Sequence, residues 1–292
     1  MWCGACRLAV SPDALAACFT ADFFYPPGYS RIHMRPVRKW GHGPYSVAVI
    51  HGGPGAPGEM APVARELSAI TGILEPFQTE TTLDGQVQEL RATLEELALP
   101  PVTLIGFSWG AFLSWIVAAR YPALVKKLIL VSSAPFEERY APAIIQKRMK
   151  RLKKKERAEA QDILARMADP QVPDKDALLA RLGSLLALAD AYDPVHPNDE
   201  GFHCQYDVFS GVWDEASELR RNNVLLEMAK AIKCPVVAIH GDTDPHPAEG
   251  VNDPLEKELD DFRFILLEKC GHRPWIERSA ADEFFRVLAK EI

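Results

Sequence analysis

A serine stands between two glycines in residues 106–110 (GFSWG), and this spacing is the strongest chemical signal in the chain. The apolar residues 102–105 predict a short buried strand, and residues 111–119 predict a largely apolar helix. A serine between such elements lies on a sharp turn, where a Cβ at either glycine would meet the neighbouring strand or helix. The turn lifts the hydroxyl to a helix N-terminus, which favours developing negative charge. We therefore expect Ser108 to be a nucleophile; the alternative is a serine that only caps the helix.

A second turn-forming segment, residues 51–55 (HGGPG), follows the apolar run 46–50, which predicts another buried strand. Glycines and a proline at this density cannot continue a strand, so they predict a tight loop whose backbone can approach a ligand closely. In an acyl-transfer enzyme, an N–H of such a loop and the N–H of the residue after the nucleophile form an oxyanion hole. We assign these roles to Gly53 and Trp109. Taken alone, the loop would be interpreted as an ordinary glycine turn.

With these two loops the chain resembles the α/β-hydrolase superfamily, and HGGPG at 51–55 together with SWG at 108–110 is similar to its proline iminopeptidase branch. The resemblance to the fold spans roughly residues 45–290, whereas the resemblance to the branch rests on the two loops. It implies an α/β-hydrolase fold with a mostly parallel sheet, helices on both faces and a helical lid insertion. It also implies the chain order nucleophile, acid, histidine.

The resemblance places the acid and the histidine after two later apolar runs. The strand expected at 234–239 leads into HGDTDP, and in the family the acid lies three residues past the glycine, which selects Asp244. Asp242 is the alternative acid. It could instead have a structural role and cap the loop by bonding its own backbone. The apolar run 262–267 is followed by a Gly-His pair and the sequence PWIE, which match the family's histidine loop, so His272 is the expected base.

Together these side chains predict nucleophilic catalysis by a serine. His272 would take the proton of Ser108 as the hydroxyl attacks a carbonyl, while Asp244 fixes the imidazole tautomer and stabilises the imidazolium. Each oxyanion donor would contribute on the order of 3 kcal/mol to the transition state. The expected enzyme is a serine hydrolase without a cofactor.

The other histidines are expected to have no role in proton transfer. Four stand in polar surroundings typical of the surface: His33, His42, His196 and His203. His51 belongs to the glycine loop, where a structural hydrogen bond is expected. His240 and His246 flank the loop that carries Asp244, which we call the acid loop, and they are the only rivals of His272 for the role of base.

The acid loop also invites interpretation as a metal site, because His240, Asp242, Asp244 and His246 alternate with other residues. Prolines bound this loop, however, and alternate residues on such a loop rarely converge on one ion. A catalytic triad already accounts for the loop. We therefore expect no metal.

The composition is that of a soluble enzyme with one core. A chain of 292 residues that is 48% hydrophobic can fill an α/β core and carry an insertion. The net charge of −7 argues against nucleic acid as a partner. No apolar run approaches about 18 residues, so no membrane span is expected. The isolated Cys204, Cys234 and Cys270 predict free thiols, and the lone pair Cys3 and Cys6 says little.

Residues 1–22 give the weakest signal. The sequence LAAC at 15–18 resembles a bacterial lipoprotein cleavage site, but Pro12 and Asp13 interrupt the apolar segment that an export signal needs. Only Arg7 supplies positive charge before that segment. We expect a small appendage or a disordered lead, and a cytoplasmic protein.

The remaining chain alternates between strand and helix patterns. Strands are expected to end near Ile50, Leu74, Phe107, Ser132, His240 and Leu267, and helices at about 60–70, 84–98, 109–121, 223–231 and 279–290. Such alternation predicts a mostly parallel sheet covered on both faces, formed here by residues 23–133 and 223–292. Residues 134–222 break the alternation and predict a helical lid over Ser108. The basic run 147–157 in it is expected to be a solvated helix face, or alternatively a surface that recruits an acidic substrate or partner.

The sequence leaves the substrate open between two classes. Proline iminopeptidases bind a free amino terminus with lid carboxylates, which residues 213–215 (WDE) could supply. Two departures argue against a peptide substrate. Residues 75–82 (EPFQTETT) replace the family's Asp-x-Arg-Gly-x-Gly-x-Ser loop, and Phe107 stands where those enzymes usually carry glycine. A small ester or other acyl substrate is therefore favoured over a short peptide.

A third alternative is a ligand-binding member of the fold without turnover. Loss of a triad residue would indicate such a protein. Ser108, Asp244 and His272 are all present, which favours the enzyme.

Overall fold

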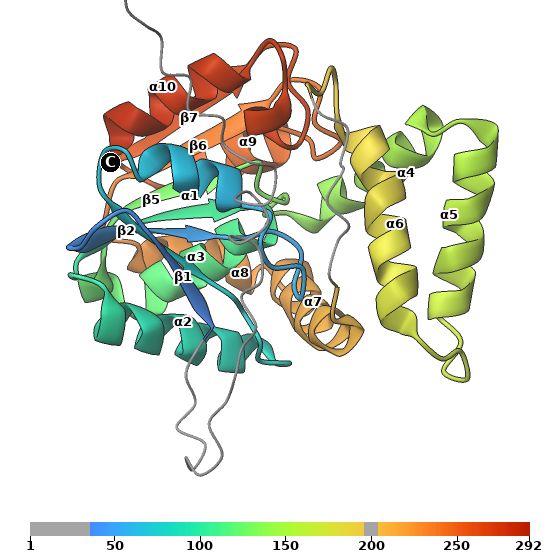
Figure 1. Cartoon of the computed structure of the whole chain (residues 1–292), viewed down its shortest axis with the longest axis horizontal. Coiled ribbons are helices and arrows are strands. Elements are labelled where there is room, and N and C mark those ends of the chain that lie inside the picture. The colour runs from blue at the N-terminus through green and yellow to red at the C-terminus, as the bar shows by residue number, and fades with distance from the viewer. Residues whose placement is uncertain (1–35, 196–203) are drawn as a thin grey trace, which may run out of the picture. The chain divides into compact units, whose positions relative to one another are not determined.

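A seven-stranded sheet runs through the computed structural model, which describes residues 36–195 and 204–292 (Figure 1). Its strands are β1 (Val37–Trp40), β2 (Tyr45–Ile50), β3 (Gly72–Pro76), β4 (Val102–Phe107), β5 (Val125–Val131), β6 (Val236–Gly241) and β7 (Phe262–Leu267). They lie in the order β1-β3-β2-β4-β5-β6-β7. β1 pairs antiparallel with β3, and the other neighbours are parallel. The prediction of a mostly parallel sheet is confirmed.

The central strands are continuous runs of buried residues. β4 has the sequence VTLIGF and β6 the sequence VVAIHG, and every residue of both is buried. Strands that are covered on both faces need apolar side chains at successive positions, rather than the alternation of a half-exposed sheet. This is why the short apolar runs of the sequence could be identified as strands.

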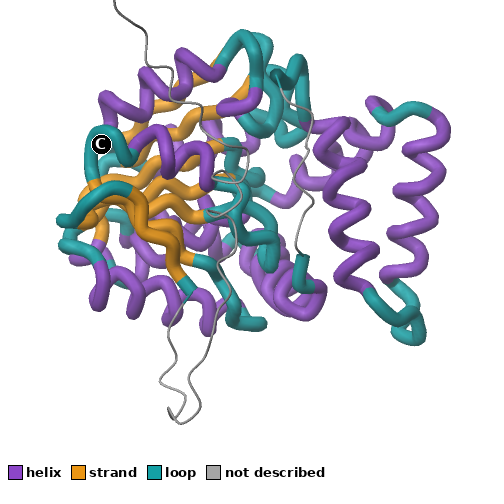
Figure 2. Tube along the Cα trace, viewed as in Figure 1, coloured by secondary structure: helices purple, strands orange, loops and turns teal. Residues whose placement is uncertain are grey.

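Helices cover both faces of the sheet (Figure 2). One face packs against α1 (Ala61–Leu67) and α10 (Ala281–Glu291). The opposite face packs against α2 (Leu83–Leu97), α3 (Trp109–Arg120), α8 (Val224–Glu227) and α9 (Glu249–Glu258). The large buried side chains of α3, Phe112 and Trp115 among them, fill this second layer.

Four further helices form what we call the helical insertion: α4 (Ala141–Arg151), α5 (Lys154–Met167), α6 (Lys175–Asp190) and α7 (Tyr206–Arg221). A separate apolar cluster joins α5 and α6 through Ile163, Met167 and Leu182. α7 instead packs on the main core through Val208 and Val212.

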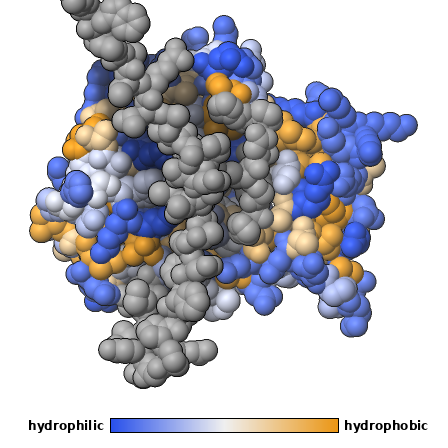
Figure 3. Space-filling model, viewed as in Figure 1, coloured by the Kyte–Doolittle hydropathy of each residue, from blue (hydrophilic) through white to orange (hydrophobic). Residues whose placement is uncertain are grey.

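The outer side of the helical insertion is polar. Hydrophilic residues dominate the right edge of Figure 3, over α5. Five lysines of the basic run are exposed: Lys147, Lys150, Lys153, Lys154 and Lys155. The run does not form the single solvated helix face that was expected, because it spans the end of α4 and the start of α5 and its Arg148 pairs with Asp190. Among the described residues, no helix has both the length and the apolar character needed to cross a membrane.

Two elements were not predicted from the sequence. β1 is a short edge strand, VRKW, with mixed polarity. α9 contains Gly250 and Pro254, which are typical of loops. The expected N-terminal appendage, the Cys3 and Cys6 pair and the expected surface positions His33, His196 and His203 lie outside the described residues.

The direction in which successive strands are added to the sheet reverses beside β2. The chain crosses from β2 to β3 on one side, and from β4 to β5 on the other. At such a reversal the connections diverge and leave a crevice at the carboxyl ends of the strands, where ligands bind in open α/β sheets. The HGGPG loop follows β2 and Ser108 follows β4, so both lie at this reversal.

Candidate active site

Ser108 occupies a sharp turn between β4 and α3 with a φ of 51° and a ψ of −113°. A positive φ at a residue with a side chain costs on the order of 1–3 kcal/mol, so the surrounding packing must hold it. A Cβ on Gly106 would lie 2.3 Å from the carbonyl oxygen of Gly110, and a Cβ on Gly110 would lie 2.3 Å from that of Ile50. The expected steric need for both glycines is confirmed. Ser108 is partly exposed within a stretch, 102–118, that is otherwise buried.

The HGGPG loop turns back beside the same strand end. Gly53 has a φ of +42°, which favours glycine. The preceding His51 is buried and holds the loop: its Nδ1 donates to the carbonyl of Gly52 at 2.8 Å, and its Nε2 accepts from the N–H of Gln78 at 3.3 Å. Burial lowers the pKa of His51 to about 4, so the ring is neutral. The expected structural role of His51 is confirmed.

The two expected oxyanion donors lie on one cavity. Gly53, Trp109 and Ser108 all line it. Trp109 is the first residue of α3, so its N–H belongs to the helix terminus that lacks intrahelical partners. The Trp109 indole is anchored by a hydrogen bond from Nε1 to Oε1 of Gln86 at 3.1 Å.

Asp244 and His272 are hydrogen-bonded, with Nδ1 of His272 donating to Oδ2 of Asp244 at 2.8 Å. Burial alone would raise the pKa of Asp244, but the charges of His272 and His246 and their hydrogen bonds hold it well below its usual value. Burial would lower the pKa of His272, and the charge and hydrogen bond of Asp244 raise it. The alternative acid, Asp242, is exposed and accepts from the N–H of Cys270 at 3.0 Å.

A second histidine contacts the same carboxylate. Oδ1 of Asp244 accepts from the backbone N–H of His246 at 2.8 Å and from its Nδ1 at 2.9 Å. The rings of His246 and His272 stack, with centroids 4.3 Å apart and planes 20° apart. The sequence marked His246 only as a rival base. Its spacing of two residues from the acid was the available signal for this shared contact.

The described residues offer one cluster with the donor types of a metal site, formed by Asp244, His246 and His272, whose ligand atoms lie within 4.8 Å of one another. Its geometry suits hydrogen bonding better than ligation. A ring nitrogen directs its lone pair within the ring plane, so an ion in the plane of one stacked ring lies outside the plane of the other. Both Nδ1 atoms are already engaged by the carboxylate.

The four alternating residues of the acid loop do not converge on one point. Nε2 of His240 donates to the carbonyl of His246 at 3.0 Å, while the side chain of Asp242 bonds the N–H of Cys270. Both side chains therefore hold backbone groups in and beside the loop through hydrogen bonds.

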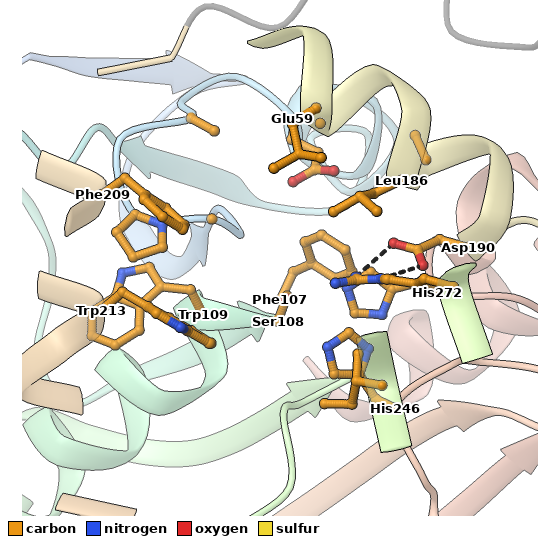
Figure 4. Close-up of a pocket in the computed structure, with 18 of the residues that line it drawn as sticks. Glu59, Phe107, Ser108, Trp109, Leu186, Asp190, Phe209, Trp213, His246 and His272 are labelled. Carbon is orange, nitrogen blue, oxygen red and sulfur yellow. Dashed lines mark hydrogen bonds and ion pairs between the residues drawn. The ribbon is translucent and has the colours of Figure 1, made fainter. Parts of the chain in front are cut away.

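The cavity that contains Ser108 has a volume of about 410 Å³ and lies between the strand ends and the helical insertion (Figure 4). The insertion supplies mostly apolar lining: Ala141, Ile144, Ile145, Leu179, Leu182 and Leu186. Phe209 and Trp213 of α7 close another side. The ring of Phe107 packs against His272 at 4.9 Å and against Trp275 at 4.7 Å between centroids. This residue, which departs from the iminopeptidase pattern, therefore holds the histidine loop.

The described lining includes five charged side chains, Glu59, Arg148, Asp190, Arg220 and Arg273. Arg148 of α4 forms a bidentate ion pair with Asp190 at the end of α6, with both N–O distances 2.7 Å. The backbone carbonyl of Asp190 accepts from the N–H of His272 at 2.8 Å. The insertion is thus hydrogen-bonded to the histidine loop.

Glu59 is another charged residue of the lining, and it was not identified from the sequence. Its side chain points into the cavity (Figure 4), and no hydrogen bond to its carboxylate occurs among the described residues. Burial raises the pKa of Glu59, opposed by the charges of Arg273 and His272. The residue lies in a turn of the connection that leads to α1, where no local pattern predicts that it faces the site.

The carboxylates suggested by the segment 213–215 point elsewhere. Asp214 and Glu215 are exposed, and Oε2 of Glu215 accepts from the N–H of Leu83 at 3.0 Å. Only Trp213 of that segment lines the cavity. Glu59 and Asp190 are the carboxylates that the described cavity wall provides.

Ser108 and His272 share the cavity wall, but the described part of the structure contains no hydrogen bond between the Ser108 hydroxyl and the imidazole. Catalytic hydrogen bonds are often long in the absence of substrate. The structure therefore joins two of the three expected triad members directly and brings the third to the same cavity.

Comparisons with known proteins agree on the fold. A family model described as alpha/beta hydrolase fold matches residues 71–279. The proline iminopeptidase of Lactobacillus crispatus is 23% identical and aligns over 84% of this chain and 88% of its own. A probable alcohol acetyltransferase of Wickerhamomyces anomalus is 35% identical, but over only 23% of this chain and 19% of that relative's length.

Solved structures match over most of the chain. The crystal structure of VinJ aligns with a TM-score of 0.60 and 18% identity, covering 87% of this chain and 93% of VinJ. A putative lipase from Acinetobacter baumannii aligns with a TM-score of 0.58 and 18% identity, covering 87% of each chain. At this identity the likeness concerns the fold.

Proposed function

The chain belongs to the alpha/beta hydrolase family, and we propose that within it this protein is a serine hydrolase that cleaves a small ester or related acyl substrate through an acyl-enzyme intermediate. One observation carries the proposal: a strained, partly exposed Ser108 shares a cavity with a buried, hydrogen-bonded Asp244–His272 pair. The largely apolar lining favours a small apolar acyl group over a polar one.

The proposed reaction has two halves. Ser108 Oγ attacks the carbonyl carbon and its proton passes to Nε2 of His272, while Asp244 stabilises the imidazolium. The backbone N–H groups of Gly53 and Trp109 bind the oxyanion. His272 then gives the proton to the leaving alcohol, which departs and leaves the acyl group on Ser108. A water molecule attacks this ester with its proton passing to His272, and the acid is released as Ser108 regains its proton.

We further propose that the helical insertion serves as a lid. It supplies the apolar wall opposite Ser108, and it is joined to the histidine loop through the N–H of His272 and the carbonyl of Asp190. A lid in this place would exclude water from the acyl-enzyme and limit the length of the acyl chain.

Short-chain nitrophenyl esters test the proposed function. We expect the unmodified protein to hydrolyse them and Ser108→Ala to lose about 10³-fold or more of kcat, because no nucleophile remains. Ser114→Ala is the matched control, since Ser114 lies on the same helix with a buried hydroxyl that has no hydrogen-bond partner in the described structure. Equal turnover by the Ser108 variant and the control would contradict the proposal.

A second candidate function, cleavage of an amino-terminal residue, is favoured by Glu59. A carboxylate without a hydrogen-bond partner in the described cavity could bind the ammonium group of an aminoacyl substrate. The proline iminopeptidase of Lactobacillus crispatus is among the relatives that align over most of this chain.

Proline and alanine anilides, assayed beside the esters, separate the two functions. The aminopeptidase candidate predicts turnover of anilides and a rise in KM for them in Glu59→Gln, with little change for uncharged esters. Turnover of esters alone, unaffected by Glu59→Gln, supports the ester hydrolase. A protein that acts on neither class would be a ligand-binding member of the fold.

A further inference from the structure

Asp244 uses both carboxylate oxygens to bind imidazole rings. Oδ2 accepts from His272 at 2.8 Å, and Oδ1 accepts from Nδ1 of His246 at 2.9 Å and from its backbone N–H at 2.8 Å. The proposed mechanism uses His272 but gives no role to His246. Both histidines line the cavity, and all three side chains are buried.

The two rings are held in parallel by this shared carboxylate. Each attaches through Nδ1, and their planes stack with centroids 4.3 Å apart. A carboxylate bound through one oxygen alone can rotate about its Cβ–Cγ bond, because this torsion has a broad energy minimum. The backbone N–H of His246 already holds Oδ1, Nδ1 of the ring adds a second donor that narrows the remaining rotation, and the stacked ring limits tilting of His272.

His246 acts here as a neutral hydrogen-bond donor. Burial and the charge of His272 lower the pKa of His246 to about 4, against the attraction of Asp244. The proton of the neutral ring lies on Nδ1, because the carboxylate accepts there. His246 therefore contributes a fixed hydrogen bond rather than a second positive charge beside His272.

We propose that His246 is a positioning residue of the Asp244–His272 pair: its Nδ1–H and its stacked ring fix the carboxylate and thereby orient the imidazole toward Ser108. This inference rests on the proposed serine hydrolase activity and adds a fourth member to the triad. His246 acts through Asp244 and not on the substrate.

Three substitutions at this position separate the contributions of the ring atoms. Asn places an amide nitrogen where Nδ1 lies, so His246→Asn keeps the donor to Asp244. Gln places its amide near the former Nε2, so His246→Gln keeps a polar group toward the cavity and moves the donor from Oδ1. His246→Ala removes both.

Ester kinetics provide the first readout. We expect His246→Ala to lower kcat by about 10- to 100-fold with KM nearly unchanged, because a small misorientation of a catalytic group has an effect of this size. His246→Asn should recover most of the loss, and His246→Gln should not. Rescue by Gln and not by Asn, or wild-type kcat in the Ala variant, would overturn the inference.

The pH profile of kcat/KM provides a readout that a purely structural role would not move. Loss of the ring donor on Oδ1, where the backbone N–H of residue 246 remains, leaves Asp244 a stronger acceptor for His272, so the acidic limb in His246→Ala should shift to higher pH. The other charged or titratable groups near His272 are unchanged in this variant: Asp190, Arg148, Glu59, Arg273 and His240. An unshifted limb would contradict the inference.

Proton NMR of the resting protein tests the inference independently of turnover. The Nδ1 proton of His272, hydrogen-bonded to Asp244, should give a low-field resonance in the wild type and in His246→Asn. In His246→Ala the resonance should broaden or disappear, because the pair is less ordered. A protein that shows this pattern but hydrolyses no ester would refute the proposed function and retain the positioning role. An unchanged resonance in a folded Ala variant would refute the positioning role.

Discussion

The two walls of the cavity are built in different ways. On the sheet side, backbone atoms determine the shape: a Cβ at Gly106 or Gly110 would come within 2.3 Å of a backbone oxygen. On the side of the helical insertion, apolar side chains such as Leu182 and Leu186 form the wall, and the insertion packs around a small cluster of its own. The reacting groups are therefore placed by rigid backbone packing, whereas the substrate space is defined by side chains that can be exchanged.

The two walls meet at a small set of polar contacts. Asp190 makes one of them, because its carbonyl accepts from the N–H of His272, while its carboxylate pairs with Arg148 inside the insertion. Arg151 of α4 makes another by donating to the carbonyl of Thr243, and it also donates to the carbonyl of Ala189 within the insertion. Changes at these contacts should therefore affect both walls, and changes elsewhere in the insertion should affect only its own wall.

Gly110→Ala should have the largest effect, because the added methyl group meets backbone that cannot move independently. Overpacking of this kind costs about 3 kcal/mol, and more where only backbone is in contact. We expect the free energy of unfolding in urea to fall by at least this amount, with little folded protein recovered. A normally stable and active Gly110→Ala protein would show that the sheet-side wall is not rigid.

Acid should destabilise the sheet side before the insertion. The pKa of buried His51 is lowered from 6.5 to about 4. As the pH falls, the unfolded chain therefore takes up a proton on this histidine before the folded protein does. Its contribution is fully present above pH 6.5 and is lost as the pH falls toward 4, by about 3 kcal/mol. His246 has a shift of the same size, whereas the described part of the insertion, 141–195 and 204–221, has no histidine. Urea unfolding at several pH values should show the loss, and His51→Gln should reduce it.

Arg148→Met should loosen the end of α6 within the insertion and, through the carbonyl of Asp190, weaken the contact between the walls. The substitution leaves the carboxylate of Asp190 with a side-chain exposure of 9% and without its hydrogen-bonding partner, which costs about 2 kcal/mol. Ester turnover should fall as well, because Asp190 also holds the histidine loop. The matched control is Arg181→Met on the exposed face of α6, whose pair with Glu159 should contribute nothing measurable. Equal thermal shifts in the two variants would contradict the proposed connection.

Gly183→Ala should have the smallest effect, and of the opposite sign. Gly183 lies inside α6 and lines the cavity. Replacing a helical glycine with alanine stabilises by about 0.5–1 kcal/mol. A modest rise in melting temperature is expected, together with a higher KM for longer acyl esters in the narrowed cavity. A loss of stability comparable to that of Gly110→Ala would remove the distinction between the walls.

The sheet side could be predicted from the sequence because its signals are local. The apolar runs that became β2 and β4, and the glycines that follow them, are adjacent in the chain, and their steric requirements arise from neighbouring residues. The edge strand β1 carried no such signal, since VRKW is stabilised by antiparallel pairing with β3 and by Arg38 bound to Glu75. α9 was missed because Gly250 and Pro254 locally favour a loop, while Val251 and Leu255 pack into the core.

The residues that line the cavity were harder to predict, because no local sequence signal marks them. Glu59 and Asp190 face it only through tertiary packing, whereas Asp214 and Glu215, next to a cavity-lining tryptophan, do not line it, and Glu215 instead binds the N–H of Leu83. The second contact of Asp244 with His246 likewise depends on how the loop after β6 folds back. A sequence specifies which residues can react, and packing decides which of them meet.

Labelling with a fluorophosphonate, read by mass spectrometry of the modified peptide, tests whether His272 activates Ser108 as a nucleophile. A fluorophosphonate reacts with a serine hydroxyl only when a base activates it. We predict stoichiometric modification of Ser108 in the wild type and loss of that reaction, by at least about 10³-fold in rate, in a folded His272→Ala protein. Modification of Ser108 at the same rate without His272, or no modification of Ser108 in the wild type, would contradict this prediction.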